Sequence, residues 1–248
     1  MRALLVIALA ACQAGVAPAP PPPRVVVEIS ARAEWRVVAR ALGDAEVYDT
    51  PFGGWLRHRI GNEDVVFFHG GFGKLAAAAA TQYAIDRWRP QLLVNLGTCG
   101  GFGGERKVGD LVLASETIVY DAIERMNNRP HAVDDFNTKL DLARWPARLA
   151  DRVVETPLIS GDQDLDPAAV ATLHATYHAS AGDWESGAVA FTAAHNHTPV
   201  LVLRGVTDLV DATGDVTYNA PGAWEQETAR LMPALIAVLS EALPDLLR

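Results

Sequence analysis

Short apolar runs rich in Val, Ile and Leu alternate along the chain with longer segments in which apolar residues recur at helical spacing. This pattern predicts strands at 25–29, 55–60, 65–68, 92–94, 110–119, 156–160 and 200–206, and helices at 33–42, 74–88, 140–153, 166–177, 185–195 and 221–243. Strands that alternate with helices, with no internal repeat, are typical of a mixed, mainly parallel twisted sheet with helices on both faces. The predicted fold class is therefore α/β, in a single domain.

The first 23 residues have a different pattern. Arg2 precedes an apolar run over residues 3–9, which is too short to cross a bilayer as a resident helix, and this order is typical of an export signal. The segment Leu9-Ala10-Ala11-Cys12 resembles the lipobox of bacterial lipoproteins, in which Cys12 becomes lipidated after cleavage. Residues 17–23 form a stiff Pro/Ala tether. We expect a signal and tether at 1–23 and a globular domain at 24–248.

This organisation predicts an exported protein that is periplasmic or anchored to a membrane through Cys12. The alternative is a misassigned start codon ahead of a cytoplasmic domain. Cysteine usage fits both, because Cys12 and Cys99 are the only two cysteines, and a lipidated Cys12 leaves Cys99 without a partner for an intramolecular disulfide.

Composition narrows the class of ligand. The chain has 248 residues, 50% of them hydrophobic, so it can bury one large core. Its formal net charge of −9 argues against a nucleic acid or an anionic membrane surface as a partner, because few basic side chains are available to hold either one. A neutral or cationic small molecule is the expected ligand.

Polar clusters follow two of the predicted strands, and a carboxylate opens the helix between them. The residues are Asn95 to Gly101, the pair Thr207-Asp208, and Glu185. Ligands of open α/β sheets bind where strands end, so these clusters are expected to form one pocket. The dinucleotide-binding fingerprint is not present, because Gly97 and Gly100 are separated by two residues and no acidic residue follows a second strand. No nicotinamide cofactor is therefore expected.

Each carboxylate allows a structural and a functional interpretation. Asp208 is either a helix N-cap or surface-loop residue, or a buried acid that holds a proton for a ring nitrogen. Glu185 either benefits from the helix dipole or accepts the vicinal hydroxyls of a ribose. Glu34 lies near the start of the first helix and has the same ambiguity. Three carboxylates at three strand-to-helix junctions favour the functional interpretation more than any one of them does.

Five motifs in order resemble the family of nucleoside phosphorylases and nucleosidases, over residues 25 to about 243. They are Gly71-Phe72-Gly73-Lys74 with its Ala run, Asn95-Leu96-Gly97-Thr98-Cys99-Gly100-Gly101 followed by residues 107–112, Ser160-Gly161-Asp162, Trp184-Glu185, and Arg204-Gly205-Val206-Thr207-Asp208. The chain is most similar to the methylthioadenosine/S-adenosylhomocysteine nucleosidase branch. That branch cleaves the bond between an adenine-type base and its sugar.

The resemblance implies a role for each carboxylate and requires neither metal nor cofactor. Glu34 matches the residue that activates the attacking water, Glu185 the one that binds the ribose hydroxyls, and Asp208 the acid that protonates the purine at its imidazole-side nitrogen. For that task Asp208 needs a raised pKa. The implied substrate-binding residues are Thr98, Cys99, Gly100, Phe102, Gln163, Asp164, Leu165 and Trp184.

The choice between water and phosphate as nucleophile depends on whether an anion can be held. Phosphorylases of this family carry an arginine in the loop after the first strand and another just before the Gly-rich cluster. Here the first segment contains Arg32 but also Glu34, and Asn95 occupies the second position. A glutamate repels phosphate and suits water. Hydrolysis is therefore predicted; a phosphorylase, or a lipoprotein that binds nucleosides without turnover, is the alternative.

The base subsite departs from the nucleosidase pattern. After Ser160-Gly161-Asp162 that family presents an aromatic residue to stack on adenine, whereas this chain continues with Gln163-Asp164-Leu165. Trp184 replaces a smaller, sugar-packing methionine. Phe102 and Trp184 are the candidates for stacking on the base, or the substrate differs from methylthioadenosine. Self-association into a homodimer or larger homo-oligomer is expected by analogy with the family.

Overall fold

The computed structural model of the chain describes residues 22–126, 131–215 and 222–248. The predicted export signal with Cys12, and all but the end of the Pro/Ala tether, lie outside these residues. Within the described ranges, no helix combines the length and the apolar character needed to cross a bilayer.

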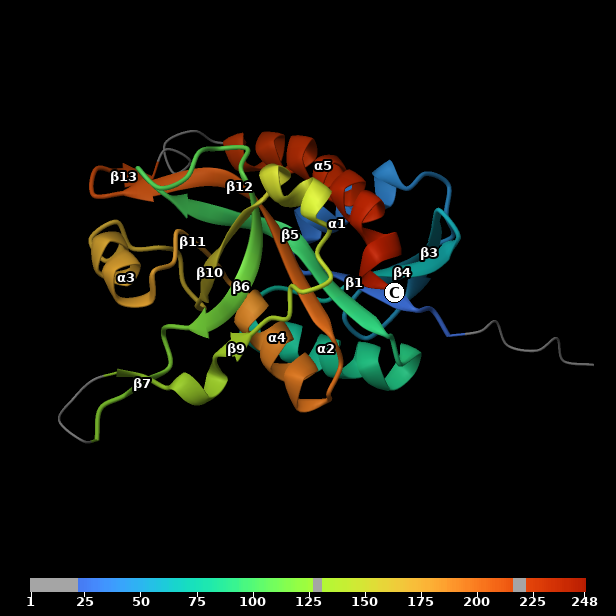
Figure 1. Cartoon of the computed structure of the whole chain (residues 1–248), viewed down its shortest axis with the longest axis horizontal. Coiled ribbons are helices and arrows are strands. Elements are labelled where there is room, and N and C mark those ends of the chain that lie inside the picture. Colours follow the sequence, from blue (N-terminus) through green and yellow to red (C-terminus); the bar gives the residue numbers. More distant parts are fainter. Residues whose placement is uncertain (1–21, 127–130, 216–221) are drawn as a thin grey trace, which may run out of the picture.

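The described elements alternate as predicted (Figure 1). The strands are β1 (Val25–Ile29), β2 (Tyr48–Asp49), β3 (Gly54–Ile60), β4 (Glu63–His69), β5 (Leu92–Phe102), β6 (Leu111–Val119), β7 (Ile123–Glu124), β8 (His131–Ala132), β9 (Thr138–Lys139), β10 (Val154–Ser160), β11 (Ala181–Asp183), β12 (Val200–Asp211) and β13 (Gly214–Asp215). The α-helices are α1 (Arg32–Ala41), α2 (Lys74–Trp88), α3 (Val170–Tyr177), α4 (Ser186–His195) and α5 (Ala223–Leu246), with 3₁₀ turns η1 (Asp134–Phe136) and η2 (Ala147–Arg152).

One mixed sheet organises the domain. Its order is β13-β12-β6-β10-β11-β5-β1-β4-β3-β2, with β9 on β6, and β12 also pairs with β5. The parallel pairs β4–β1, β1–β5 and β5–β12 lie at its centre. β5 pairs with β12 along its length and with β11 at Gly100 and Gly101. The strands β5, β12, β6, β10 and β11 therefore close into a ring. The α/β single-domain prediction is confirmed.

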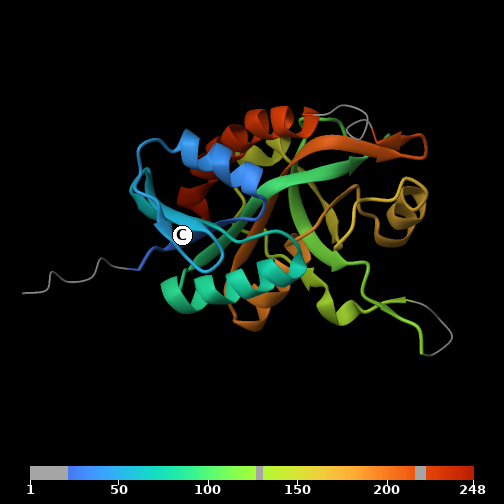
Figure 2. The same ribbon diagram turned by 180° about the vertical axis from the view of Figure 1, so that it is seen from behind.

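Helices cover both faces of this sheet. α1 and α5 pack on one face and α2 and α4 on the other, as the two opposite views show (Figures 1 and 2). Successive residues of β1 pack on opposite faces of the sheet. Val25 and Val27 belong to the core under α1 and α5, and Val26 belongs to the core under α2 and α4. A strand buried on both faces has to be apolar throughout, which explains the unbroken β-branched run.

A β-bulge in β12 decides how the polar end of this strand is presented. The pairing of β12 with β5 shifts between Val206 and Asp208, so Thr207 is an extra residue opposite Cys99 and Gly100. In a regular strand, successive side chains point to opposite faces. The bulge interrupts this alternation and lets both Thr207 and Asp208 face the same cavity.

Several predicted boundaries are wrong. β5 and β12 do not end before their polar clusters but continue to Phe102 and Asp211, because each keeps a pairing partner along that length. The helix predicted at 140–153 is only the 3₁₀ turn η2: the backbone at Leu140 still bonds to β6, and Pro146 precedes the turn. The helix predicted at 166–177 begins at Val170, after a turn that Asp166 caps through the Ala168 amide at 2.9 Å.

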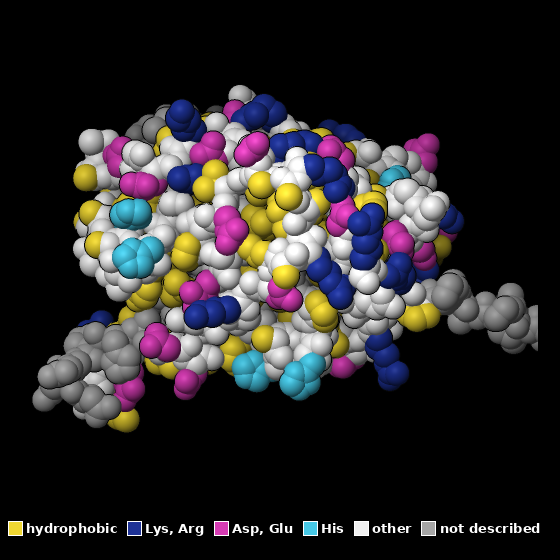
Figure 3. All heavy atoms as spheres, viewed as in Figure 1, with side chains coloured by type: hydrophobic (Ala, Val, Ile, Leu, Met, Phe, Trp, Pro, Cys, Tyr) yellow, Lys and Arg dark blue, Asp and Glu magenta, His cyan; other side chains and the backbone are white. Residues whose placement is uncertain are grey.

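The remaining surface is mixed in charge on the face drawn in Figure 3. Among the described residues there, Lys and Arg side chains are more frequent in the right-hand half of the view, and Asp and Glu side chains lie among them.

Deleting a core side chain from α5 should cost far more stability than deleting an exposed one from α2. Leu235 is fully buried between α5 and the sheet, whereas Leu75 is 88% exposed. We expect Leu235→Ala to lower the free energy of unfolding by about 2–5 kcal/mol and Leu75→Ala by less than about 0.5 kcal/mol. Urea unfolding followed by circular dichroism measures both, and equal losses would contradict the placement of α5.

Candidate active site

A cavity of about 500 Å³ opens beside the bulge in β12. It is lined from elements far apart in the sequence, by Ala31, Glu34, Phe72, Thr98, Cys99, Gly100, Gln163, Asp164, Leu165, Gly182, Asp183, Trp184, Glu185, Thr207, Asp208, Val210, Gly222, Trp224 and Glu225. The structure thus brings together every sequence-predicted site residue of the described chain except Phe102. The volume suits a nucleoside-sized ligand.

Glu34 is fixed from two directions. It lies in the first turn of α1, and its Oε2 accepts the Ala31 amide at 3.1 Å, which satisfies one orphan donor of the helix start. Its Oε1 accepts the amide and the hydroxyl of Thr98, at 2.6 and 2.7 Å, from β5. A Cβ at Gly97 would stand 3.0 Å from that oxygen, so a glycine is needed there for the close approach.

Burial makes Glu34 a better proton acceptor than an exposed glutamate. The side chain is 4% exposed, and its burial raises its pKa, while the positive charge of Arg204 and the Thr98 hydrogen bonds oppose the rise. A carboxylate with a raised pKa accepts a proton more readily than an ordinary glutamate does.

Glu185 is the N-cap residue of α4 and is 7% exposed. Its Oε1 accepts the amide of Gly73 at 2.9 Å, which ties the start of α4 to the start of α2. Burial, together with the nearby charge of Asp183, raises the pKa of Glu185 to about 8. At neutral pH the carboxyl therefore carries a proton and can both donate to and accept from the hydroxyls of a sugar.

Asp208 and Leu165 converge over Gly100. A Cβ on Gly100 would stand 3.0 Å from Asp208 Oδ2 and 3.1 Å from Leu165 Cδ1. The hydroxyl of Thr207, the extra residue of the bulge, donates to Asp208 Oδ1 at 2.6 Å. The acid is therefore oriented by its neighbour, beside an apolar surface on which a flat ring can lie.

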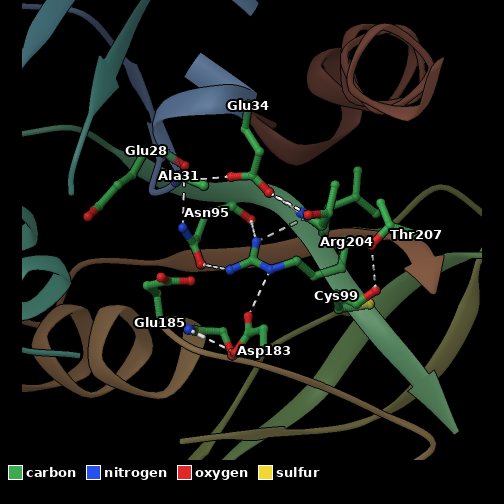
Figure 4. A network of polar contacts seen from close by, with 12 residues as sticks. Glu28, Ala31, Glu34, Asn95, Cys99, Asp183, Glu185, Arg204 and Thr207 are labelled. Atoms are coloured by element: carbon green, nitrogen blue, oxygen red, sulfur yellow. Dashed lines mark hydrogen bonds and ion pairs between the residues drawn. The ribbon is translucent and has the colours of Figure 1, made fainter. Parts of the chain in front are cut away.

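A buried ionic network lies under the cavity (Figure 4). Arg204 is 2% exposed; its Nε donates to Asp183 at 2.8 Å, and its terminal nitrogens donate to the backbone and side-chain oxygens of Asn95. Burial would lower the pKa of Arg204, but the carboxylates of Asp183 and Glu34 outweigh this effect and raise it. Asp183 also accepts the amide and hydroxyl of Ser186, and so holds the first turn of α4.

Phe102 is the one predicted site residue that the structure places elsewhere. It is 1% exposed and packs in a hydrophobic cluster with Ile118, Ile159 and Val210. The strand has passed the cavity at Gly100 by this point, and the ring is taken up by core packing. Its assignment to the substrate-binding residues is therefore corrected.

Three aromatic residues of the described ranges do line the cavity. The rings of Trp184 and Phe72 lie 4.6 Å apart between centroids at an interplanar angle of 35°. Trp224, from the first turn of α5, is the third. Of the two stacking candidates that the sequence suggested, only Trp184 is in a position to meet a ligand.

The charge of the lining is one-sided. No described lining residue is Lys, Arg or His. Six are acidic, namely Glu34, Asp164, Asp183, Glu185, Asp208 and Glu225. Such a cavity repels a phosphate ion. Among the residues with described side chains, no group of three or more His, Cys, Asp or Glu is arranged to hold a metal ion.

Sequence reasoning left several of these residues without a role. Arg204 and Asp183 are charged residues in or next to strongly apolar strands. Because buried charges need partners, the sequence could have indicated that these two residues pair. No sequence pattern pointed to Trp224 and Glu225, because α5 reaches the cavity only through the packing of the whole domain.

The comparisons with known proteins agree with the motif resemblance. The family model described as the phosphorylase superfamily matches residues 25–243. A 5′-methylthioadenosine/S-adenosylhomocysteine nucleosidase of Maridesulfovibrio salexigens is 28% identical over 204 residues, which cover 77% of this chain and 88% of that protein.

Solved structures show the same fold at lower identity. The methylthioadenosine/S-adenosylhomocysteine nucleosidase of Helicobacter pylori superposes with a TM-score of 0.75 at 18% identity, covering 90% of this chain and all of that one. Futalosine hydrolase of the same organism gives a TM-score of 0.74 at 19% identity, over 88% and 97% of the two chains. The family prediction is confirmed.

A further buried carboxyl, Glu28, lies beside the network but not in the cavity (Figure 4). It is fully buried in β1, accepts the Thr81 hydroxyl at 2.7 Å, and has its pKa raised by burial to about 8. Between pH 4.5 and 8 the unfolded chain ionises this group while the folded chain keeps its proton. The group therefore reduces stability as pH rises through that window.

Replacing this carboxyl should remove its share of the pH dependence. We expect the stability of Glu28→Gln relative to the original protein to increase between pH 5 and pH 8 with a slope of up to about 1.4 kcal/mol per pH unit. Urea midpoints at several pH values measure this difference, and Glu241→Gln, on the exposed side of α5, is the control. A difference that stays constant with pH would show that Glu28 ionises in the folded protein as it does in the unfolded chain.

Proposed function

This chain belongs to the phosphorylase superfamily, and on that premise we propose that it hydrolyses the N-glycosidic bond of an adenine-type nucleoside. Methylthioadenosine and S-adenosylhomocysteine are the model substrates, and the products are the free base and the free sugar. The observation that carries the proposal is the meeting of Glu34, Glu185 and Asp208 in one cavity. The named activity of the curated relative from Maridesulfovibrio salexigens supports it.

The chemistry requires three groups in three places. As the bond between C1′ and the base nitrogen breaks, its electron pair goes to the base, and Asp208 delivers a proton to the imidazole side of the ring. The sugar becomes an oxocarbenium-like cation, to which a water oxygen bonds at C1′. Glu34 takes the proton that this water releases. Glu185 holds the ribose hydroxyls between the two reacting ends.

Water suits this cavity better than phosphate as the nucleophile. Asn95, in the place of an arginine found in the phosphorylases, is fully buried and bonded to Arg204 beneath the cavity. The described lining offers no cationic side chain to hold a phosphate, and Glu34 would oppose one. We therefore place hydrolysis ahead of phosphorolysis.

The proposed base subsite lies at Asp208, Leu165 and Gly100, with Gln163 and Asp164 at its edge. Leu165 supplies an aliphatic surface to this subsite. Trp184 is proposed to pack against the sugar, next to Glu185. Thr98 and Cys99 complete the floor from β5.

Two further parts of the proposal concern the setting of the enzyme. We propose that Cys12 is lipidated after export and anchors the domain through the Pro/Ala tether; globomycin-sensitive processing in cells, lost in Cys12→Ser, tests this. We also propose self-association. The apolar ring of Phe72, which lines the cavity and is 59% exposed, supports it.

Turnover with and without phosphate tests the function directly. The purified protein is incubated with methylthioadenosine or adenosine in phosphate-free buffer and in buffer with inorganic phosphate, and free base and sugar products are separated by chromatography. Hydrolysis predicts free base and free sugar in both buffers. Product that forms only with phosphate, as a sugar 1-phosphate, would establish a phosphorylase; tight binding without product would establish a binding protein.

Substituting the acid should abolish turnover but preserve binding. We expect Asp208→Asn to reduce kcat by about three orders of magnitude or more with little change in nucleoside Kd, because the proton is needed only as charge develops on the base. Asp211→Asn, three residues along the same strand and bonded to Thr213, is the matched control and should keep full activity. A fully active Asp208→Asn variant would reject the assigned role.

A further inference from the structure

Asn95 occupies the centre of the sheet but not the cavity. It lies on β5 opposite Glu28 of β1 and Val202 of β12, and it is fully buried. Its side-chain amide donates to the backbone oxygen of Glu28 at 3.3 Å. Its two oxygens, from the backbone and from the side chain, both accept hydrogen bonds from Arg204. Asn95 thus holds the guanidinium with two oxygens, while its side-chain amide nitrogen bonds to β1 (Figure 4).

Arg204 in turn is held on its other side by Asp183, at 2.8 Å. In the described part of the chain, Arg204 donates to Asn95, to Asp183 and to the Leu203 backbone oxygen. Of these partners only Asp183 contributes a formal charge. The titratable groups whose charges act on this cluster from the packed elements are Glu28 of β1, Glu34 of α1, Cys99 of β5, Asp183 of β11, Glu185 of α4 and Asp208 of β12.

We propose that Asn95 is a positioning residue for hydrolysis: it clamps the Arg204 guanidinium below the cavity floor and thereby sets the pH range in which Glu34 accepts a proton. The proposal rests on the proposed function, since it assigns Glu34 its role as the base. Asn95 touches no reacting atom and acts only through Arg204.

The direction of the effect follows from the charges. Burial raises the pKa of Glu34, and Arg204 is the largest influence that opposes it. A guanidinium that loses the Asn95 side-chain oxygen keeps only the backbone oxygen of this residue. It then moves or draws in water, and its attraction for the ionised Glu34 weakens. The pKa of Glu34 then rises, so the base is ionised only at higher pH. An acid at position 95 would act in the same direction, because it neutralises the guanidinium without loosening it.

Two variants at this position separate an electrostatic role from a merely structural one. Both variants lose the amide donor to the Glu28 backbone oxygen. Asn95→Ala also removes the side-chain acceptor, whereas Asn95→Asp keeps the shape and the acceptor but adds a charge. We expect the acidic limb of kcat/KM against pH to move upward by about one pH unit in both, with methylthioadenosine as substrate. If Asn95 has only a structural role, its substitution should lower kcat/KM by the same factor at all pH values. Asn95→Asp should then have a smaller effect than Asn95→Ala.

The matched control is Asn196→Ala. Asn196 also makes several side-chain hydrogen bonds, to Gln82 and to the Thr192 backbone, but it lies outside the cavity at the end of α4. Its loss is expected to reduce stability and leave the acidic limb in place. Thermal unfolding of all variants reports how much of each change is a loss of folded protein.

A double-mutant cycle with Arg204→Lys tests whether Asn95 acts through Arg204. Lysine cannot make the forked contacts, so we expect Asn95→Ala to shift the limb much less in the Arg204→Lys background than in the original protein. Additive shifts, or an acidic limb that stays in place in Asn95→Ala and Asn95→Asp, would overturn the proposal.

A second readout is independent of turnover. In protein labelled with ¹³C at the glutamate carboxyl carbons, the titration of Glu34, assigned with Glu34→Gln, should move upward in both Asn95 variants. If the original protein shows no nucleoside hydrolysis, the proposed function fails, while this titration still decides whether Asn95 controls Glu34. If hydrolysis is present and the titration is unchanged, only the inference on Asn95 fails.

Discussion

The buried pair of Arg204 and Asp183 is the interaction on which the site depends. Each side chain is 2% exposed, and the pair lies beneath a cavity whose described lining is acidic. Removing one partner of such a pair leaves an uncompensated buried charge, at a cost of about 3–5 kcal/mol. Arg204 is the cation that allows several carboxyl groups to be gathered in a small buried volume, and Asp183 at the same time holds the start of α4, where Glu185 lies.

The topology of the sheet explains how these groups come to meet. β5 pairs with β1, β12 and β11, so residues of the first strand, the last long strand and the short strand before α4 lie next to one another. The bulge at Thr207 then turns two consecutive residues of β12 toward one cavity. Helix starts supply the remaining groups, since Glu34 lies in the first turn of α1 and Glu185 caps α4. The site is thus a consequence of where strands pair and helices begin.

The sequence predicted the parts of this structure that local physics determines. The apolar run of β1 and the Ala-rich α2 were placed correctly, because a doubly buried strand and a close-packed helix each leave a clear pattern. The ends of β5 and β12 were predicted wrongly. A polar strand continues for as long as a neighbouring strand pairs with it, and that neighbour is distant in sequence. The helix expected at 140–153 failed for a related reason, since β6 draws its first residue into strand pairing.

The same division applies to the site. Glu34, Glu185 and Asp208 were singled out as carboxylates at strand-to-helix junctions and given roles through the motif resemblance. Phe102 was a candidate for stacking on the base, but core packing takes its ring away from the cavity. Trp224 enters through tertiary structure alone. Its segment carries an ordinary amphipathic helix pattern, which gives no sign that its first turn reaches a ligand.

The most direct test of the central claim is a crystal structure of the protein with an unreactive C-nucleoside, in which a carbon atom replaces the base nitrogen of the bond to be broken. The expected complex has the imidazole side of the base hydrogen-bonded to Asp208, the sugar hydroxyls on Glu185, and a water between Glu34 and C1′. A nucleoside bound in the reverse orientation, or outside the cavity that holds these three carboxyl groups, would contradict it.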